Sequence, residues 1–268
     1  MTNAGPGRRS LPTGDSQIRR HGQAIELFQL AYCQVAAAQL PPNDYALKGG
    51  GNLRFFLRSP RRSADLDLDY RGRDFDRFAR RLDETLASRA LGELLHLRDI
   101  RLSDIRRAKD TATVKRWKFA LVRPGMEDAS SKIEFSSRPA AEQPVFEEMD
   151  GRLARRLGAV AVRLNHYRPV PTIQQKVGAL ADRSETEPRD LFDLDHLFRL
   201  YPEALPQAAL DPVKTRGAID RALEIPYADY ATLVAEYLEE DVVDLYGTEQ
   251  AWSDMVLRVV HQLEGKLQ

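Results

Sequence analysis

The sequence has few of the features that would place a protein in a membrane or outside the cell. It contains one cysteine, Cys33, which excludes an internal disulfide and a cysteine-based metal site. Its longest apolar runs, such as residues 35–38 and 159–162, are far shorter than the roughly 18–20 residues that a membrane span needs. The first residues lack the apolar stretch of a secretory signal. We therefore expect a cytoplasmic protein with no membrane partner.

Net charge is also absent, because 40 basic residues balance 40 acidic ones, but the charges are unevenly distributed. Residues 1–180 hold 32 Lys and Arg against 21 Asp and Glu, a balance of +11, whereas residues 181–268 hold 8 against 19, a balance of −11. Such asymmetry indicates two regions with different partners. Of the basic residues 32 are arginine, which either serves bidentate phosphate recognition or reflects codon bias in a GC-rich genome.

Apolar periodicity predicts an α+β lobe followed by a helical lobe. We expect a disordered tail over residues 1–15, the α+β lobe over 16–170 and the helical lobe over 171–268. The predicted strands cover residues 45–48, 64–70, 94–102, 111–122, 132–136 and 159–164. The predicted helices cover residues 16–40, 52–57, 74–90, 172–182, 189–200, 213–223, 227–239 and 249–263.

A glycine-rich segment, LKGGGNLRFF, lies between the strand at residues 45–48 and the helix at residues 52–57. Backbone N–H groups of Gly49, Gly50 and Gly51 could close on a phosphate there, and Lys48 and Arg54 flank the turn. A Gly-rich connection is more often only a tight turn, so this segment alone leaves both interpretations open.

Three aspartates alternate with leucines at Asp65, Asp67 and Asp69. On a strand, residues two apart share a face, so the three carboxylates would gather on one surface. Like charges at that spacing repel one another. A divalent cation such as Mg²⁺ or Mn²⁺ would compensate them, and pairing of a solvated edge strand with nearby arginines is the alternative.

Together, a glycine turn followed one helix and one strand later by an Asp-x-Asp pair form the layout of the nucleotidyltransferase superfamily. Metal ions bridging such carboxylates and the nucleotide phosphates allow in-line attack by an acceptor hydroxyl. That chemistry calls for a third carboxylate on a neighbouring strand. Glu134, between apolar Ile133 and Phe135, fits this role, and an exposed strand residue paired with Lys132 or Arg138 is the alternative.

The motifs KGG…LR, R-x-S-x-D-L-D, K-x-x-A-L…R and R-D-x-x-D-L, in this order from about Tyr45 to Leu197, resemble the AbiEii/AbiGii-type nucleotidyltransferase toxins, including the MenT group. The resemblance implies a polymerase-β-like nucleotidyltransferase lobe with a mixed sheet, followed by a helical lobe. It also implies NTP and Mg²⁺ (or Mn²⁺) use and a cognate antitoxin. Some members of the family add nucleotides to the 3′ end of tRNA.

The resemblance assigns roles to individual residues of this chain. The metal-binding pair falls on Asp65 and Asp67 after Ser63, the triphosphate-contacting base on Lys176 and the acid of the last motif on Asp190, with Asp193 as its second Asp. The predicted catalytic residues are accordingly Asp65, Asp67, Lys176 and Asp190. The predicted nucleotide-binding residues are Lys48, Gly49, Gly50, Gly51, Asn52, Arg54, Ser63 and Lys176, and the predicted metal ligands are Asp65, Asp67 and Glu134.

Two departures from the family pattern bear on these roles. The family usually has Ser or Thr where this chain has Gly51, so a phosphate-binding hydroxyl is missing and Asn52 is the substitute donor that we expect. Asp69 creates a second Asp-x-Asp register, Asp67/Asp69, but Arg61 and Ser63 fit only the Asp65/Asp67 register.

Basic clusters suggest an RNA surface. The first contains Arg101, Arg106, Arg107, Lys109, Lys115, Arg116 and Lys118, with Trp117 available to stack a base. Of these we select Arg106, Arg107, Lys115, Arg116 and Lys118 as RNA-binding candidates; the solvated face of a hairpin is the alternative. A second cluster, Arg152, Arg155, Arg156, Arg163 and Arg168 with His166 and Tyr167, has the same two interpretations.

The sequence therefore predicts a Mg²⁺-dependent nucleotidyltransferase that acts on RNA, first of all the 3′ end of tRNA, as the toxin of a toxin–antitoxin or phage-defence system. We expect a monomer when it is free of antitoxin. Transfer to a protein or small-molecule hydroxyl is the first alternative. A catalytically degenerate binding protein of the same fold is the second.

Overall fold

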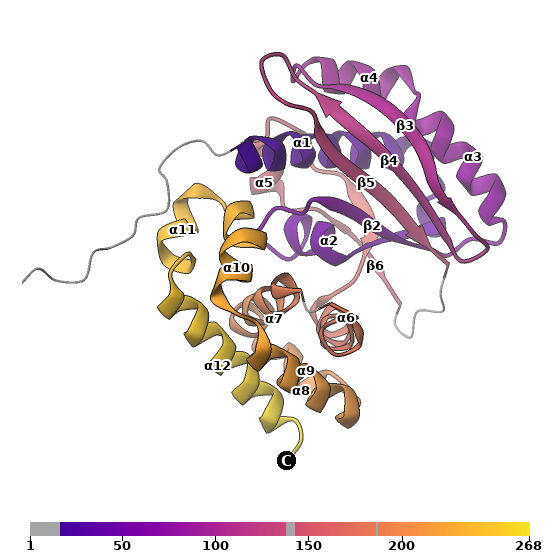
Figure 1. Ribbon diagram of the computed structural model, residues 1–268. Coiled ribbons are helices and arrows are strands. Elements are labelled where there is room, and N and C mark those ends of the chain that lie inside the picture. The colour runs from indigo at the N-terminus through magenta and orange to yellow at the C-terminus, as the bar shows by residue number, and fades with distance from the viewer. Residues whose placement is uncertain (1–16, 138–142, 186) are drawn as a thin grey trace, which may run out of the picture.

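A computed structural model of the chain describes residues 17–137, 143–185 and 187–268 (Figure 1). Its strands are β1 (Tyr45–Lys48), β2 (Asp65–Tyr70), β3 (Arg101–Asp110), β4 (Val114–Val122), β5 (Ala129–Ser136), β6 (Val145–Glu148) and β7 (Arg163–His166). Its first helices are α1 (Gln17–Gln39), α2 (Gly49–Phe55), α3 (Phe75–Leu86), α4 (Arg89–His96) and α5 (Gly151–Arg156). The later helices are α6 (Pro169–Asp182), α7 (Pro188–Leu200), α8 (Ala204–Gln207), α9 (Pro212–Glu224), α10 (Tyr227–Leu233), α11 (Glu240–Tyr246) and α12 (Glu249–Gly265). The predicted tail over residues 1–15 lies outside the described residues.

The strands form one mixed seven-stranded sheet with the order β3-β4-β5-β2-β1-β7-β6. β2 is central: it pairs in parallel with β5 and antiparallel with β1. The parallel register sets Asp65 opposite Lys132 and Asp67 opposite Glu134. Residues far apart in sequence are thus brought onto one surface.

One face of the sheet carries the first core. Leu66 and Leu68 of β2, Phe135 of β5 and Trp117 of β4 are buried there together with side chains of α1, α3 and α4. Figure 1 shows α3 and α4 running behind β3 and β4. Because side chains alternate along each strand, the acidic and basic residues between these apolar positions occupy the other face.

The helices after β7 enclose a second core. It is built from α6 to α12 and also takes Leu53 and Leu57 from α2 and the turn after it. The predicted boundary at residues 170/171 falls at the start of α6, yet α2 contributes apolar side chains to both cores, since Phe55 belongs to the first. Division of the chain into separate domains stays a prediction.

Helix capping explains why several observed helices and strands differ from the predicted ones. Residues 74–90 form no single helix: Asp74 caps α3, and Ser88 accepts a hydrogen bond from Leu91 N–H and starts α4. The first part of the strand predicted at residues 94–102 is therefore helix, and β3 begins only at Arg101. Helix α2 starts at Gly49 rather than at Asn52, so the three glycines lie within its first turn.

Among the described residues we find no helix with the length and apolar character needed to cross a lipid bilayer.

Candidate functional site

Charged residues form two cross-strand rows on the open face of the sheet. One row runs from Asp65 through Lys132 and Lys118 to Arg106, on β2, β5, β4 and β3. The next runs from Lys48 on β1 through Asp67 and Glu134 to Arg116. Asp67 and Glu134 are therefore direct neighbours on adjacent strands, and Asp65 lies two residues before Asp67 on the same face of β2.

Asp67 is the carboxylate at the centre of this arrangement. Burial raises its pKa, the neighbouring charges of Asp65 and Glu134 raise it further, and Lys132 and Lys48 partly offset the rise. Within the described part of the chain its carboxylate takes part in no salt bridge or side-chain hydrogen bond. A half-buried carboxylate with acidic neighbours is a position at which an added cation is favoured.

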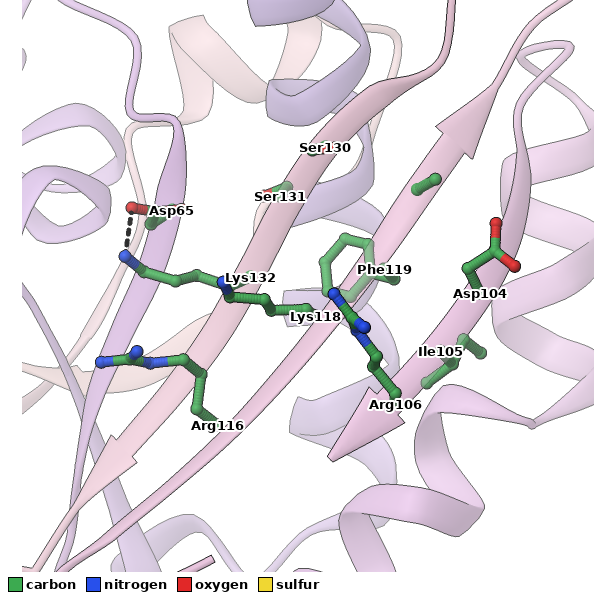
Figure 2. Close-up of a pocket in the computed structure, with 11 residues that line it drawn as sticks. Asp65, Asp104, Ile105, Arg106, Arg116, Lys118, Phe119, Ser130, Ser131 and Lys132 are labelled. Carbon is green, nitrogen blue, oxygen red and sulfur yellow. Dashed lines mark ion pairs between the residues drawn. The ribbon is translucent and has the colours of Figure 1, made fainter. Parts of the chain in front are cut away.

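The two flanking carboxylates are already paired with cations. Lys132 Nζ lies 2.9 Å from an Asp65 oxygen, and the Arg116 guanidinium lies 2.5 Å from Glu134 Oε2. Figure 2 shows the Asp65–Lys132 ion pair at the edge of the cavity. In this arrangement the described residues contain no ready-made group of three metal-binding side chains.

Asp69 holds Lys48 in place. Its Oδ1 accepts from Lys48 Nζ at 2.5 Å and from Ser136 Oγ at 2.9 Å, and its Oδ2 accepts from Tyr167 Oη at 2.7 Å. The Lys48 ammonium also donates to Ser136 Oγ at 2.5 Å. With three partners Asp69 is engaged as an anchor, which favours Asp65/Asp67 over Asp67/Asp69 as the metal-binding register.

The first turn of α2 approaches the carboxylates closely. Gly49 has a φ of 62°, a left-handed conformation that glycine adopts without strain, and a Cβ at this position would lie 3.1 Å from Asp67 Oδ2. A Cβ on Gly50 would overlap Ser63 Oγ. Ser63 donates to the Asp65 carbonyl at 2.8 Å. The glycines thus let the α2 backbone lie against Ser63 and Asp67.

Gly51 has a different role. A Cβ at Gly51 would point into the apolar layer, 2.9 Å from Leu66 Cδ1 and 3.3 Å from Leu47 Cδ1. A hydroxyl at this position would face two leucines that are fully buried, away from the carboxylates. The absence of Ser or Thr is therefore explained by packing of α2 on β1 and β2, and it does not by itself indicate a lost nucleotide site.

We predict that Gly51→Ser destabilises the protein by about 1–3 kcal/mol, because an added side chain overpacks the contact with Leu66. Nucleotide affinity should not improve. Urea unfolding and titration with Mg²⁺–NTP would measure both quantities. Gly92→Ser in α4 is the matched control: apart from its chain neighbours and its own helix backbone, no atom lies within 4 Å of a Cβ there, and the change should be neutral or slightly stabilising. An unchanged unfolding midpoint for Gly51→Ser would contradict the packing argument.

Two predicted nucleotide-binding side chains are not brought to the site. Asn52 is fully buried: its amide donates to the Tyr167 carbonyl at 2.9 Å and its Oδ1 contacts His166 Nδ1 at 3.0 Å. Arg54 is buried between Glu26 and Glu239 and donates to the Ser59 carbonyl at 2.8 Å. Their side chains fasten α2 to distant segments and are not directed at the carboxylates.

Lys176 and Asp190 do come together, from α6 and α7. Lys176 Nζ lies 2.7 Å from Asp190 and 2.6 Å from Asp193, both of which are fully buried. Burial alone would raise the pKa of Asp193, but the charges and hydrogen bonds of Arg61 and Lys176 outweigh it and lower the pKa.

The sequence motifs include two further arginines, Arg61 and Arg183, but sequence analysis did not predict their contacts with these aspartates. Arg61 forms a two-pronged contact with Asp193, at 3.1 and 2.9 Å, and Arg183 lies 2.9 Å from Asp190. Arg61 Nη2 would also be 3.3 Å from a Cβ on Gly50, so the network extends to the first turn of α2. A buried carboxylate requires a cationic partner, and this requirement is the signal that could have identified the two arginines as partners.

A cavity of about 820 Å³ opens on the charged face beside Asp65. Figure 2 shows four basic side chains, Arg106, Arg116, Lys118 and Lys132, projecting over this cavity from β3, β4 and β5. Three of the five predicted RNA-binding residues, Arg106, Arg116 and Lys118, therefore lie next to the candidate metal ligands.

The other two candidates lie on the opposite face. Lys115 is buried with Asp76 and Asp110 as partners, and Arg107 pairs with Asp83 and Asp110. Trp117 is also buried on that side, so its predicted role in base stacking is wrong. The second basic cluster is likewise engaged in part: Arg168 pairs with Glu147 at 2.7 Å, Arg156 pairs with Glu239, and Tyr167 is fully buried.

Comparisons with known proteins agree with this fold. The chain is similar to the crystal structure of JHP933 from Helicobacter pylori, with a TM-score of 0.56 and 20% identity over 91% of this chain and 94% of that one. It is also similar to a Helicobacter pylori protein described as a candidate nucleotidyltransferase, with a TM-score of 0.57 and 21% identity over 94% of this chain and 98% of that one. MenT4, a nucleotidyltransferase toxin from Mycobacterium tuberculosis, gives a TM-score of 0.49 and 16% identity over 94% and 90%, a weaker likeness that adds nothing to the fold.

Among proteins with curated descriptions, none matches the chain. A sequence family does match: the profile described as "Nucleotidyl transferase AbiEii toxin, Type IV TA system" covers residues 33–264, which is most of the chain. That span includes every motif on which the resemblance was based. The chain therefore belongs to the AbiEii family of nucleotidyltransferase toxins of type IV toxin–antitoxin systems.

Proposed function

We propose that this family member is a Mg²⁺-dependent nucleotidyltransferase that transfers a nucleotide from an NTP to an RNA hydroxyl. The 3′ end of tRNA is the acceptor that we propose. The observation that carries the proposal is the position of Asp67. It lies between two further carboxylates, has a raised pKa, and faces the first turn of α2 at Gly49.

The residues present fit a divalent cation. Three carboxylates on adjacent strands supply the hard oxygen ligands that Mg²⁺ and Mn²⁺ prefer, and the unpaired Asp67 is the one most in need of a cation. Asp65, Asp67 and Glu134 would hold it. When bound, the cation supplies charge neutralisation for the nucleotide phosphates and activation of an attacking hydroxyl.

The chain's own basic groups would orient the triphosphate. Lys48, anchored by Asp69, and the backbone N–H groups at the start of α2 lie beside Asp67. Lys176 pairs with Asp193, Asp193 pairs with Arg61, and the Arg61 guanidinium lies next to Gly50. Through these contacts Lys176 approaches the same turn from the helical lobe. Asp190 would position Lys176 through their ion pair.

The charge of the cavity favours a polyanionic acceptor. Four basic side chains line this cavity, against two acidic side chains, Asp65 and Asp104. Phosphodiester groups of RNA would neutralise these cations, and a cationic small molecule would be repelled.

Membership in a toxin–antitoxin family implies an antitoxin as partner. We extend the proposal to growth inhibition through modification of tRNA, including phage defence.

The direct test is incubation of the purified protein with Mg²⁺, total tRNA and each labelled NTP in turn, beside an Asp65→Ala/Asp67→Ala variant. We expect label on tRNA from one NTP and none with the variant. Label on protein instead would overturn the RNA acceptor in favour of a protein hydroxyl. No label on any acceptor, together with no NTP binding, would indicate a degenerate site.

Charge reversal in the cavity gives a sharper test of the acceptor. Arg106→Glu/Lys118→Glu should weaken tRNA binding on the order of 10- to 100-fold and reduce the slope of log K against log salt by about 2, because two phosphate contacts are lost. Fluorescence anisotropy at several salt concentrations measures both. Arg77→Glu/Arg80→Glu, an equal charge change at exposed positions of α3 behind the sheet, is the control. Equal losses from the two pairs would contradict binding in the cavity.

A further inference from the structure

We infer that Lys132 and Arg116 exchange partners during binding. They neutralise Asp65 and Glu134 in the metal-free protein and bind acceptor phosphates when a divalent cation takes those carboxylates, so that cation and RNA bind cooperatively. The inference rests on the proposed function, which assigns the carboxylates to a metal and the cavity to RNA.

The geometry places each cation between two potential partners. Lys132 is directly opposite Asp65 in the parallel β2–β5 register, and Arg116 is directly opposite Glu134 in the β4–β5 register. Both cations also line the cavity. Figure 2 shows Lys132 reaching toward Asp65 at the cavity edge, with Arg116 projecting beside it. A small rotation of these long side chains would move the charge from the carboxylate to the cavity.

Exposure indicates that these two ion pairs are exchangeable. The Lys132 and Asp65 side chains are 30% and 21% exposed, and those of Arg116 and Glu134 are 31% and 23% exposed. Ion pairs that water reaches contribute little net stability, so breaking them costs little. The nearby pair of Lys176 and Asp193 is 9% and 0% exposed and has no such freedom.

The exchange couples the two ligands in both directions. RNA phosphates that bind Lys132 and Arg116 would leave Asp65 and Glu134 without their cation partners, next to the third carboxylate, Asp67. The affinity for a divalent cation would then increase by the same factor by which the cation increases the affinity for RNA. Without RNA and cation, the protein would present carboxylates that are masked by its own side chains.

The expected effect of Mg²⁺ on the affinity for RNA is opposite in sign to the usual effect of salt. Cations compete with proteins for RNA phosphates, so Mg²⁺ ordinarily weakens protein–RNA association. Tighter RNA binding in Mg²⁺ at constant ionic strength would therefore identify a specific linkage rather than screening.

The test measures equilibrium binding without turnover. A fluorescent single-stranded RNA that ends in a tRNA-like 3′ sequence is titrated with the full chain at fixed ionic strength, with and without Mg²⁺ and without NTP. For the wild type we expect Mg²⁺ to tighten binding about 5-fold or more, which is the lower range of measured couplings. Asp65→Asn/Glu134→Gln should bind RNA tightly without Mg²⁺ and gain nothing from it.

A matched variant separates this effect from net charge. Glu240→Gln/Asp241→Asn removes the same two negative charges from exposed positions on α11, away from the cavity, and should keep the wild-type response to Mg²⁺. The inference is overturned if Mg²⁺ weakens wild-type binding as other salts do, or if Asp65→Asn/Glu134→Gln binds no more tightly than this control. If tRNA is still labelled in the transfer assay, the proposed function survives that failure. If neither the wild type nor any variant binds RNA, both the inference and the proposed function are contradicted.

Discussion

Asp67→Asn is expected to abolish nucleotide transfer and, in metal-free buffer, to raise the melting temperature. The loss of activity should reach about 1000-fold or more, equivalent to ~4 kcal/mol of transition-state stabilisation, because the central metal carboxylate is removed. The gain in stability follows from the raised pKa of Asp67: burial and the charges of Asp65 and Glu134 disfavour its ionised form in the folded state. An amide of the same shape carries no such charge.

The pH dependence has a defined sign. Because the folded-state pKa of Asp67 lies above the unfolded value of about 3.9, the wild type loses stability relative to Asp67→Asn as pH rises through the interval between these two values. At higher pH the difference stays constant. Thermal melts from pH 3 to 8 with EDTA would measure it, and added Mg²⁺ should stabilise the wild type alone.

Asp69→Asn, two residues away on the same strand, is the matched control. It weakens the ion pair with Lys48 and the hydrogen bond from Tyr167, so its melting temperature should fall. A melting temperature for Asp67→Asn below that of the wild type in EDTA would contradict the description of Asp67 as an uncompensated charge.

The sequence predicted the acidic face well because strand alternation is a local signal. Asp65 and Asp67 were expected to share a face, and Glu134 was expected to reach it from a neighbouring strand. The structure places Glu134 directly opposite Asp67. The same alternation was available for the basic cluster: Lys115 shares its face with Trp117 and other large apolar residues, which indicates burial rather than RNA contact.

Proximity in sequence was a poor guide where a helix begins. Asn52 and Arg54 follow the glycines, but the helical rotation of α2 turns their side chains away from Asp67. Their partners, Tyr167 and Glu239, lie 115 and 185 residues further along the chain. No local pattern reports such pairs, and for the same reason the two-pronged contact between Arg61 and Asp193 emerged only from the fold.

The largest expected effect on stability comes from that contact. Asp193→Ala should destabilise the protein by about 3–5 kcal/mol, because it leaves Arg61 and Lys176 as buried cations that have lost a shared carboxylate. Burial alone would raise the pKa of Asp193, but Arg61 and Lys176 lower it below the ordinary value. Its contribution is therefore complete above the unfolded pKa of about 3.9 and is lost as pH falls through the folded-state pKa.

Urea unfolding of wild type and variant at pH 7 and at acid pH would measure this difference and its decline. Asp190→Ala is the comparison that isolates the Arg61 contact. Lys176 would keep Asp193 as a partner, and Arg183, whose side chain is 38% exposed, could turn to solvent, so the loss should be smaller. Equal losses from the two substitutions would mean that Lys176 alone carries the stability of the network. A larger loss for Asp193→Ala would instead establish Arg61 as the residue that joins α7 to the first turn of α2, where Gly50 leaves room for its guanidinium.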